Sequence, residues 1–406
     1  MSFLRRLSTR RLLAVIGGAL AVVAGGTAIA IAATSSSPVP PKESLPVAVR
    51  QALAAPAVKG VTARIAFTNE LIDSSSLPGS TPLLTGATGR LWATADGSVR
   101  LELQSAQGGG DVQIVVKGND VSLYEAGSKT LYKATLPEEK AGRKAEKEHG
   151  IPTLSALQKA LRHLRTDANV SGATPTSVAG RGAYSVEISP KRDGGLVGAA
   201  KIAWDAVTGT PLRVGVYAAG RQDPVLELTA TDISYGDVDA GVFDVAAPAD
   251  AKVVDLTPQL QELADKQGDH GKKAGNHKAK GVSGAAAVRK AAGFDVSAPA
   301  ALAGLPRKAV RLVTVDGHQA ALAIYGKGLG AIAVLQSPAE KPAAGDDAGK
   351  GDDVSKALPE VSIDGATGHE LATALGTVIT FERDGVSYTV LGSVPPAAAE
   401  AAARGL

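Results

Sequence analysis

The chain has 406 residues, of which 44% are hydrophobic and 20% charged, and its formal net charge is +3. This balance is typical of a globular protein, and the dispersed basic residues with only 3% aromatics argue against a nucleic-acid-binding face. The absence of cysteine excludes disulfides, thiolate metal sites, a cysteine nucleophile and acylation at a lipobox cysteine.

The N-terminal segment, residues 1–44, combines arginines, an apolar run from Leu12 to Ala33 and a polar, Pro-rich stretch. As a helix the apolar run would be roughly 33 Å long, about the thickness of one hydrocarbon core. It is interpreted either as a cleaved signal peptide or as a retained anchor with its arginines in the cytoplasm. Both interpretations predict an exported protein, secreted or held at the outer face of the cytoplasmic membrane.

The next two hundred residues read mainly as strands. A short helix is expected at 46–54. Alternation of apolar and polar residues, bounded by Gly, Asp and Asn, predicts strands within 61–72, 89–104, 111–136, 182–190, 201–217 and 224–236. Turns at 96–97, 118–120, 127–128 and 205–209 divide the longer stretches into hairpins.

One convincing amphipathic helix interrupts these strands, in "IPTLSALQKALRHLR". Its narrow apolar stripe consists of Leu154, Leu157, Leu161 and Leu164. The polar residues Gln158, Lys159, Arg162 and Arg165 lie away from that stripe. We expect this helix to be a lid on the sheet.

Roughly ten or eleven antiparallel strands cannot bury a whole apolar face under one such stripe. The sheet must therefore close on itself, pack on another domain or partner, or leave an apolar hollow for a ligand. Alternation predicts that one concave surface is lined by Leu101, Leu103, Ile114, Val214, Val216, Leu226 and Leu228. Trp92 and Trp204 are expected nearer the outer face or the rim.

The order of these segments resembles the bacterial outer-membrane lipoprotein carrier family, the LolA-like proteins, over roughly residues 61–256. "GRLWATADGSVRLEL" is similar to an early strand pair of that family. "VKGNDVSLYEAGSKTLYKA" is similar to its central hairpins, with Tyr124 and Tyr132 at aromatic positions. "ISYGDVDAGVFDVAAPADAKV" resembles its C-terminal signature, with Phe243 and Pro248 before the last strand.

The resemblance implies a curved, incomplete barrel with helices as a lid and a lipid acyl chain held in the hollow. In this family an arginine on an early strand latches the lid, and Arg64 and Arg90 are the candidates for that position.

Beyond the carrier-like region, residues 45–265, the composition changes twice. The Gly-, Lys- and His-rich residues 266–281 are expected to form a flexible linker, in which His270 and His277 are expected to be solvated rather than metal ligands. Residues 282–406 are expected to form a small α+β domain, with strands within 308–336, a hairpin at 372–394 and a terminal helix at 396–404.

Sequences that resemble catalytic motifs are incomplete. "YGKGLGAI" lacks the spacing of a phosphate-binding loop, and "HELAT" at His369 has Thr373 where a second zinc-binding histidine is needed. No Gly-x-Ser-x-Gly motif is present. We therefore expect no catalytic activity, no cofactor and no metal site.

The sequence predicts a mainly β (α+β) protein, a curved antiparallel half-barrel with a helical lid followed by a small α+β domain. The favoured function is an exported carrier of lipid or lipoprotein acyl chains. The alternative is a membrane-tethered extracytoplasmic sensor that acts through a membrane regulatory protein, since regulators of envelope-stress sigma factors also resemble a LolA-like domain followed by a smaller one.

Overall fold

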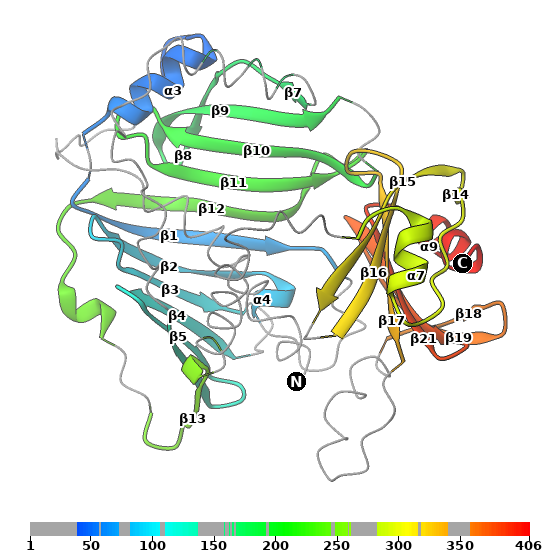
Figure 1. The fold of residues 1–406 in the computed structure, drawn as a ribbon. Helices are drawn as coiled ribbons and strands as arrows, with labels where there is room; N and C mark the ends of the chain where they lie inside the picture. Colours follow the sequence, from blue (N-terminus) through cyan, green and yellow to red (C-terminus); the bar gives the residue numbers. More distant parts are fainter. Residues whose placement is uncertain are drawn as a thin grey trace, which may run out of the picture.

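The computed structural model describes residues 39–56, 58–72, 82–105, 110–136, 158, 162, 165, 168–191, 195–244, 248–258, 260, 282–315, 318–339 and 358–406. These residues form a 13-stranded sheet and an 8-stranded sheet that lie side by side (Figure 1). The structure thus confirms the predicted mainly β fold.

The large sheet contains strands from residues 60–255. In chain order they are β1 (Gly60–Asn69), β2 (Ala87–Thr94), β3 (Val99–Gln104), β4 (Asp111–Lys117), β5 (Asp120–Glu125), β6 (Thr130–Thr135), β7 (Ala168–Val170), β8 (Thr174–Val178), β9 (Arg181–Pro190), β10 (Val197–Asp205), β11 (Pro211–Ala218), β12 (Pro224–Tyr235) and β13 (Lys252–Asp255). Their spatial order is β13-β6-β5-β4-β3-β2-β1-β12-β11-β10-β9-β7, with β8 beside β9. The predicted count of ten or eleven strands is therefore too low.

A seam between the first and last long strands lies in the middle of this sheet. On β1, Val61 pairs with Ala93 of β2 on one side and with Tyr235 of β12 on the other. A β-bulge interrupts the β1–β12 pairing between Arg64 and Ile65. The pairs within the sheet are antiparallel except for β13, which runs parallel to β6.

The sheet is strongly curved at its β9 end. Val178 of β8 packs with Leu212 of β11 and with Ile233 of β12, although β8 pairs only with β9. The edge hairpin therefore curls back across the concave face toward the seam, which gives the half-barrel shape expected from the sequence.

Two helices of the described residues pack on this sheet. Helix α3 (Leu45–Ala54) buries Leu45 and Ala48 against Tyr184 and Trp204. The single-turn helix α4 (Pro82–Thr85) places Leu83 against the cluster formed by β1 to β4. The sequence predicted α3 but not α4.

The predicted lid helix falls largely outside the described residues, including its four leucines Leu154, Leu157, Leu161 and Leu164. Gln158, Arg162 and Arg165 are described, and they are helical and exposed. Those three positions agree with a helix whose polar side faces solvent.

The second sheet has the order β14-β15-β16-β17-β21-β20-β19-β18. Its strands are β14 (Ala301–Leu302), β15 (Leu305–Val315), β16 (His318–Tyr325), β17 (Ile332–Pro338), β18 (Glu360–Ile363), β19 (Ala366–Thr373), β20 (Gly376–Arg383) and β21 (Val386–Gly392). Helices α7 (Ala285–Ala291) and α9 (Pro396–Arg404) bury Val288 and Ala399 against one face. Fully buried Gln336 exchanges hydrogen bonds of 2.8 and 2.7 Å with the backbone of Ser297, which fixes the segment after α7 to the sheet.

The two sheets are joined by backbone hydrogen bonds. The Leu196 amide, just before β10, donates to the Ser393 carbonyl at 2.9 Å and to the Ser393 hydroxyl at 3.1 Å. The Ala374 amide donates to the Leu71 carbonyl at 2.9 Å. The α+β unit thus contacts the half-barrel at the ends of β1 and β10.

Candidate functional site: an apolar face of the half-barrel

The seven predicted cavity residues lie on one face of the large sheet. On one side of the seam, Leu101 pairs with Ile114 and with Leu91, and Leu91 in turn pairs with Ala63 of β1. Leu103 follows Leu101 by two residues and shares its face. Beyond the seam, Leu228 pairs with Phe67 of β1 and with Val214, and Leu226 pairs with Val216.

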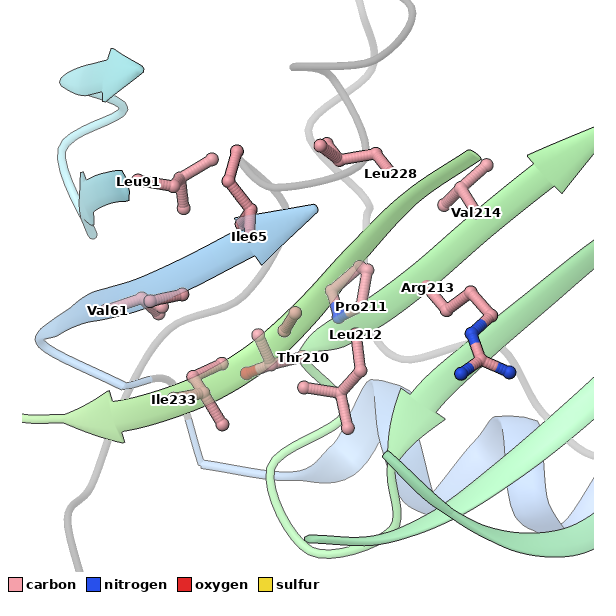
Figure 2. Close-up of a pocket in the computed structure, with 12 residues that line it drawn as sticks. Val61, Ile65, Leu91, Thr210, Pro211, Leu212, Arg213, Val214, Leu228 and Ile233 are labelled. Carbon is pink, nitrogen blue, oxygen red and sulfur yellow. The ribbon is translucent and has the colours of Figure 1, made fainter. Parts of the chain in front are cut away.

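Only part of this face is hollow. A pocket of about 60 Å³ lies where β1, β11 and β12 meet (Figure 2). Its lining is almost entirely apolar and comprises Val61, Ala63, Ile65, Leu91, Thr210, Pro211, Leu212, Arg213, Val214, Leu228, Ala230 and Ile233. Pockets that hold small molecules usually measure roughly 300–1,000 Å³, so this one holds an acyl chain only after it widens.

The other predicted cavity residues are divided between a packed region and an open region. Leu103 and Ile114 are buried in the cluster beneath Leu83 of α4, and Leu101 packs against that cluster. Val216 and Leu226 are half-buried farther along the same face. Of the seven, the structure brings only Val214 and Leu228 into the pocket.

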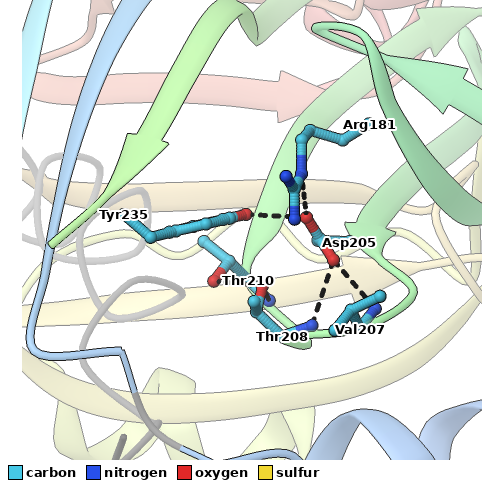
Figure 3. Close-up of polar contacts among 6 residues, drawn as sticks. All are labelled: Arg181, Asp205, Val207, Thr208, Thr210 and Tyr235. Atoms are coloured by element: carbon cyan, nitrogen blue, oxygen red, sulfur yellow. Dashed lines mark hydrogen bonds and ion pairs between the residues drawn. The ribbon is translucent and has the colours of Figure 1, made fainter. Parts of the chain in front are cut away.

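A buried polar network holds the turn that lines one end of the pocket (Figure 3). Asp205, whose side chain is 1% exposed, accepts hydrogen bonds from Arg181 Nε at 2.8 Å and from the Tyr235 hydroxyl at 2.9 Å. Its second oxygen accepts from the backbone amides of Val207 and Thr208 at 2.8 and 3.0 Å. Burial, followed by the Asp205 charge, raises the pKa of Tyr235 well above its ordinary value, so the hydroxyl stays protonated and donates.

This network ties the β8–β9 turn, the β10–β11 turn and β12 together. The turn predicted from Asp205 and Gly209 is present, and Gly209 adopts a φ of +71°. A Cβ on Gly209 would lie 2.4 Å from the Ala52 carbonyl oxygen, so only glycine lets α3 approach this turn. The curled end of the pocket therefore depends on both residues.

The two tryptophans differ in how well they match expectation. Trp92 lies beside Arg100, whose guanidinium is 5.8 Å from the ring centroid, on the face opposite Leu91 and Leu101. Trp204, expected at the outer face or rim, is instead buried between Tyr184 and helix α3. The expectation was wrong because Trp204 lies two residues after Ile202, whose partner Val214 is on the apolar face, and alternation within one strand does not show that pairing.

The two candidates for a lid-latching arginine, Arg64 and Arg90, also lie opposite the apolar face. They alternate with Ala63, Ile65 and Leu91, which line the pocket. Neither arginine therefore faces the apolar pocket.

Further expectations concern metals and membranes. Within the described residues, no group of three or more His, Cys, Asp or Glu side chains could hold a metal ion. No helix in that part of the chain is long and apolar enough to cross a membrane. The apolar run from 12 to 33 and the linker histidines His270 and His277 lie outside the described residues.

The described residues form a curved half-barrel with an attached α+β unit. No protein-family model and no curated protein matches the chain. The chain is similar to MucB in complex with MucA(peri), with 14% identity, 88% of this chain and 94% of that chain covered, and a TM-score of 0.36.

Two further structures are similar to it. For the MucA/MucB complex of Pseudomonas aeruginosa, the identity is 17%, the coverage 88% and 94%, and the TM-score 0.35. For a LolA superfamily protein from Nitrosomonas europaea, the identity is 10%, the coverage 50% and 98%, and the TM-score 0.21. Structures of the fold family suggested by the sequence are thus among those similar to this chain, and the function proposed below is derived from this chain's own residues.

Proposed function

We propose that the protein is an exported binding protein that holds a lipid or lipoprotein acyl chain against the apolar face of its half-barrel, without catalysis. The observation that carries the proposal is the continuous apolar row from β4 across the seam to β11. Val214, Val216 and Leu226 on this row are half-buried. If hydrocarbon covers them, the complex is stabilised by roughly 25 cal/mol per Å² of apolar surface removed from water.

Because the pocket measures only about 60 Å³, uptake requires the face to open. Helix α4 is the element suited to move. It is a single turn followed by Gly86 at a φ of +81°, and its Leu83 is only half-buried. Displacing Leu83 would join the pocket to the surface over Leu101 and Leu103, giving a groove along the strands.

The test uses the full chain in its native membranes and a photoactivatable fatty acid, with adducts located by peptide mapping. We expect adducts on β1, β11 and β12. The double variant V214D/L228D places two carboxylates on the apolar face and should lower the adduct yield there by about tenfold, equivalent to about 1.4 kcal/mol.

A matched control, V207D/V253D, likewise introduces two carboxylates, at valines that are 67% and 53% exposed and lie outside the apolar pocket, and it should label like the wild type. The uncharged variant V214N/L228Q covers the case in which V214D/L228D fails to fold, as judged by circular dichroism. Adducts confined to other strands would contradict the proposal. It would also be contradicted if a folded V214D/L228D or V214N/L228Q protein were labelled as strongly as the wild type.

A second candidate is the membrane-tethered sensor that acts through a protein partner. It is favoured by an apolar row on the second sheet, on the face opposite α7 and α9. Direct pairing aligns Ile324, Ala333, Leu391, Val378 and Leu371 there. Leu391 is 44% exposed, as a docking residue would be.

The N-terminal segment separates the two candidates. A sensor keeps the 12–33 run as an anchor, whereas a carrier that diffuses between membranes must lose it. The intact mass of the mature protein distinguishes them.

A further inference from the structure

Two arginines stand directly opposite each other on the convex face of the large sheet. Arg64 of β1 pairs with Arg90 of β2 in the antiparallel register. Both side chains are exposed, and in the described structure neither makes a hydrogen bond or an ion pair. Like charges at directly paired positions destabilise a sheet, so the pair needs an explanation.

The neighbouring carboxylates form no ion pair with either arginine within the described residues. Glu102 pairs with Arg90 in register, but its Oε1 accepts from Arg100 at 2.9 and 2.6 Å. Arg100 is held in turn by the Val242 carbonyl at 2.6 Å. Asp232, opposite Arg64, is exposed and forms no ion pair within the described structure. The two guanidiniums are therefore the groups left to meet a ligand.

The arginines border a hollow of about 560 Å³, much larger than the apolar pocket. Thr88, Gln104 and Thr231 also line it and supply hydroxyl and amide groups. Glu102 lines it as well, and its Oε1 is held by Arg100. Thr231 is the extra residue of the β1–β12 bulge beside Arg64, and bulges commonly re-aim side chains at functional sites. Two unpaired guanidiniums, three neutral polar side chains and one carboxylate that is already bonded to Arg100 thus line one opening.

We propose that this hollow, the Arg64–Arg90 site, binds a phosphate group carried by a ligand. Each guanidinium presents a planar fork of N–H donors that matches two phosphate oxygens, and a dianion between the forks removes their mutual repulsion. The site lies on the face opposite the apolar row. It stands whether or not that row holds an acyl chain.

The test measures binding of inorganic phosphate to the purified full chain in uncharged detergent by calorimetry, against chloride at equal ionic strength. Wild type should bind saturably, and R64Q/R90Q should bind at least about tenfold more weakly. R311Q is the matched control, because Arg311 is exposed on the second sheet and likewise lacks an ion pair within the described residues. R90K keeps the charge but loses the fork, and it should bind with intermediate affinity.

A second titration with dihexanoylphosphatidic acid distinguishes the source of the phosphate. Tighter binding than inorganic phosphate, by a margin that disappears in R64Q/R90Q, indicates a lipid headgroup. Equal affinity for both probes indicates a soluble phosphate compound. Absence of saturable binding of either probe, or unchanged binding in a folded R64Q/R90Q protein, overturns the proposal.

Discussion

Asp205 is a buried carboxylate whose oxygens accept four hydrogen bonds, from Arg181, Tyr235 and two backbone amides. Removing one partner of a buried charge pair leaves the other charge desolvated and unpaired. The Arg181 side chain is only 16% exposed, so water can solvate its charge only in part if Asp205 is removed. Loss of Asp205 would therefore destabilise the fold mainly because it leaves the Arg181 charge buried and unpaired.

We expect D205A to lower the free energy of unfolding by roughly 3–5 kcal/mol, measured by urea denaturation. The control is D244A, which removes an ion pair of similar length, 2.6 Å between Asp244 and Lys117. The side chain of Asp244 is 69% exposed. That variant should change stability by less than about 1 kcal/mol. Similar losses in both variants would show that the Asp205 network does not hold the curled end of the sheet.

Glu370 links the stability of the second sheet to pH. Its register partner is Ile379, a core residue, and its Oε2 atom is buried without a hydrogen-bond partner in the described structure. Burial, and then the Glu400 charge, raises the pKa of Glu370 above its ordinary value. The charged groups of α9 near it are Glu400 and Arg404, which bond to each other.

A carboxyl group with a raised folded-state pKa binds its proton more tightly when folded, so stability falls as pH rises from the unfolded pKa through the folded one. We expect E370Q to remove that fall and to be more stable than wild type at neutral pH. Thermal unfolding between pH 4 and 8 would measure it, where pH 4 is about the ordinary carboxyl pKa. E382Q, at an exposed position on β20, should leave the pH profile unchanged. If the stability of E370Q fell with rising pH in parallel with that of the wild type, Glu370 would not be the cause of the fall.

At the scale of elements, hairpins with strong turn chemistry could be predicted and irregular elements could not. Asp96-Gly97 and Asp384-Gly385 mark the β2–β3 and β20–β21 turns, and the structure has both. Strands β7 and β8 were missed because Gly172 and Pro175 break their short apolar pattern. Helix α4 spans one turn, which is too short to show a periodicity.

The apolar face could be predicted, whereas the position of the pocket could not. Alternation alone placed Val214 and Leu228 on the correct face. The pocket lies where bulges at Leu212 and Thr231 bend β11 and β12, and bulges depend on pairing across the sheet. The sequence pattern also gave no sign that Leu103 and Ile114 would be covered by α4.

At the scale of the molecule, contact between the two sheets depends on Gly195. Its φ is +62°, and a Cβ there would lie 1.6 Å from the Ser393 carbonyl oxygen. G195A should therefore separate the α+β unit from the half-barrel. We expect faster limited proteolysis near residue 195 and a larger radius of gyration in X-ray scattering.

The control is G220A. Gly220 has a φ of +76°, but nothing lies within 4 Å of its Cβ position. Both variants carry the left-handed strain of roughly 1–2 kcal/mol, and only G195A adds the collision. If the two variants have equal dimensions and equal protease sensitivity, Gly195 does not control the contact.

The seam between β1 and β12 also determines when the protein can fold. Val61 cannot pair with Tyr235 until the chain between them has been synthesised. Until then, the edge of β1 that pairs with β12 in the folded protein is unpaired. Such edges recruit other strands, and a chain without cysteine has no disulfide to hold an early intermediate. Slow closure from distant contacts follows from this topology. The nascent half-sheet is therefore the stage at which a chaperone that covers β1 would most increase the yield of folded protein.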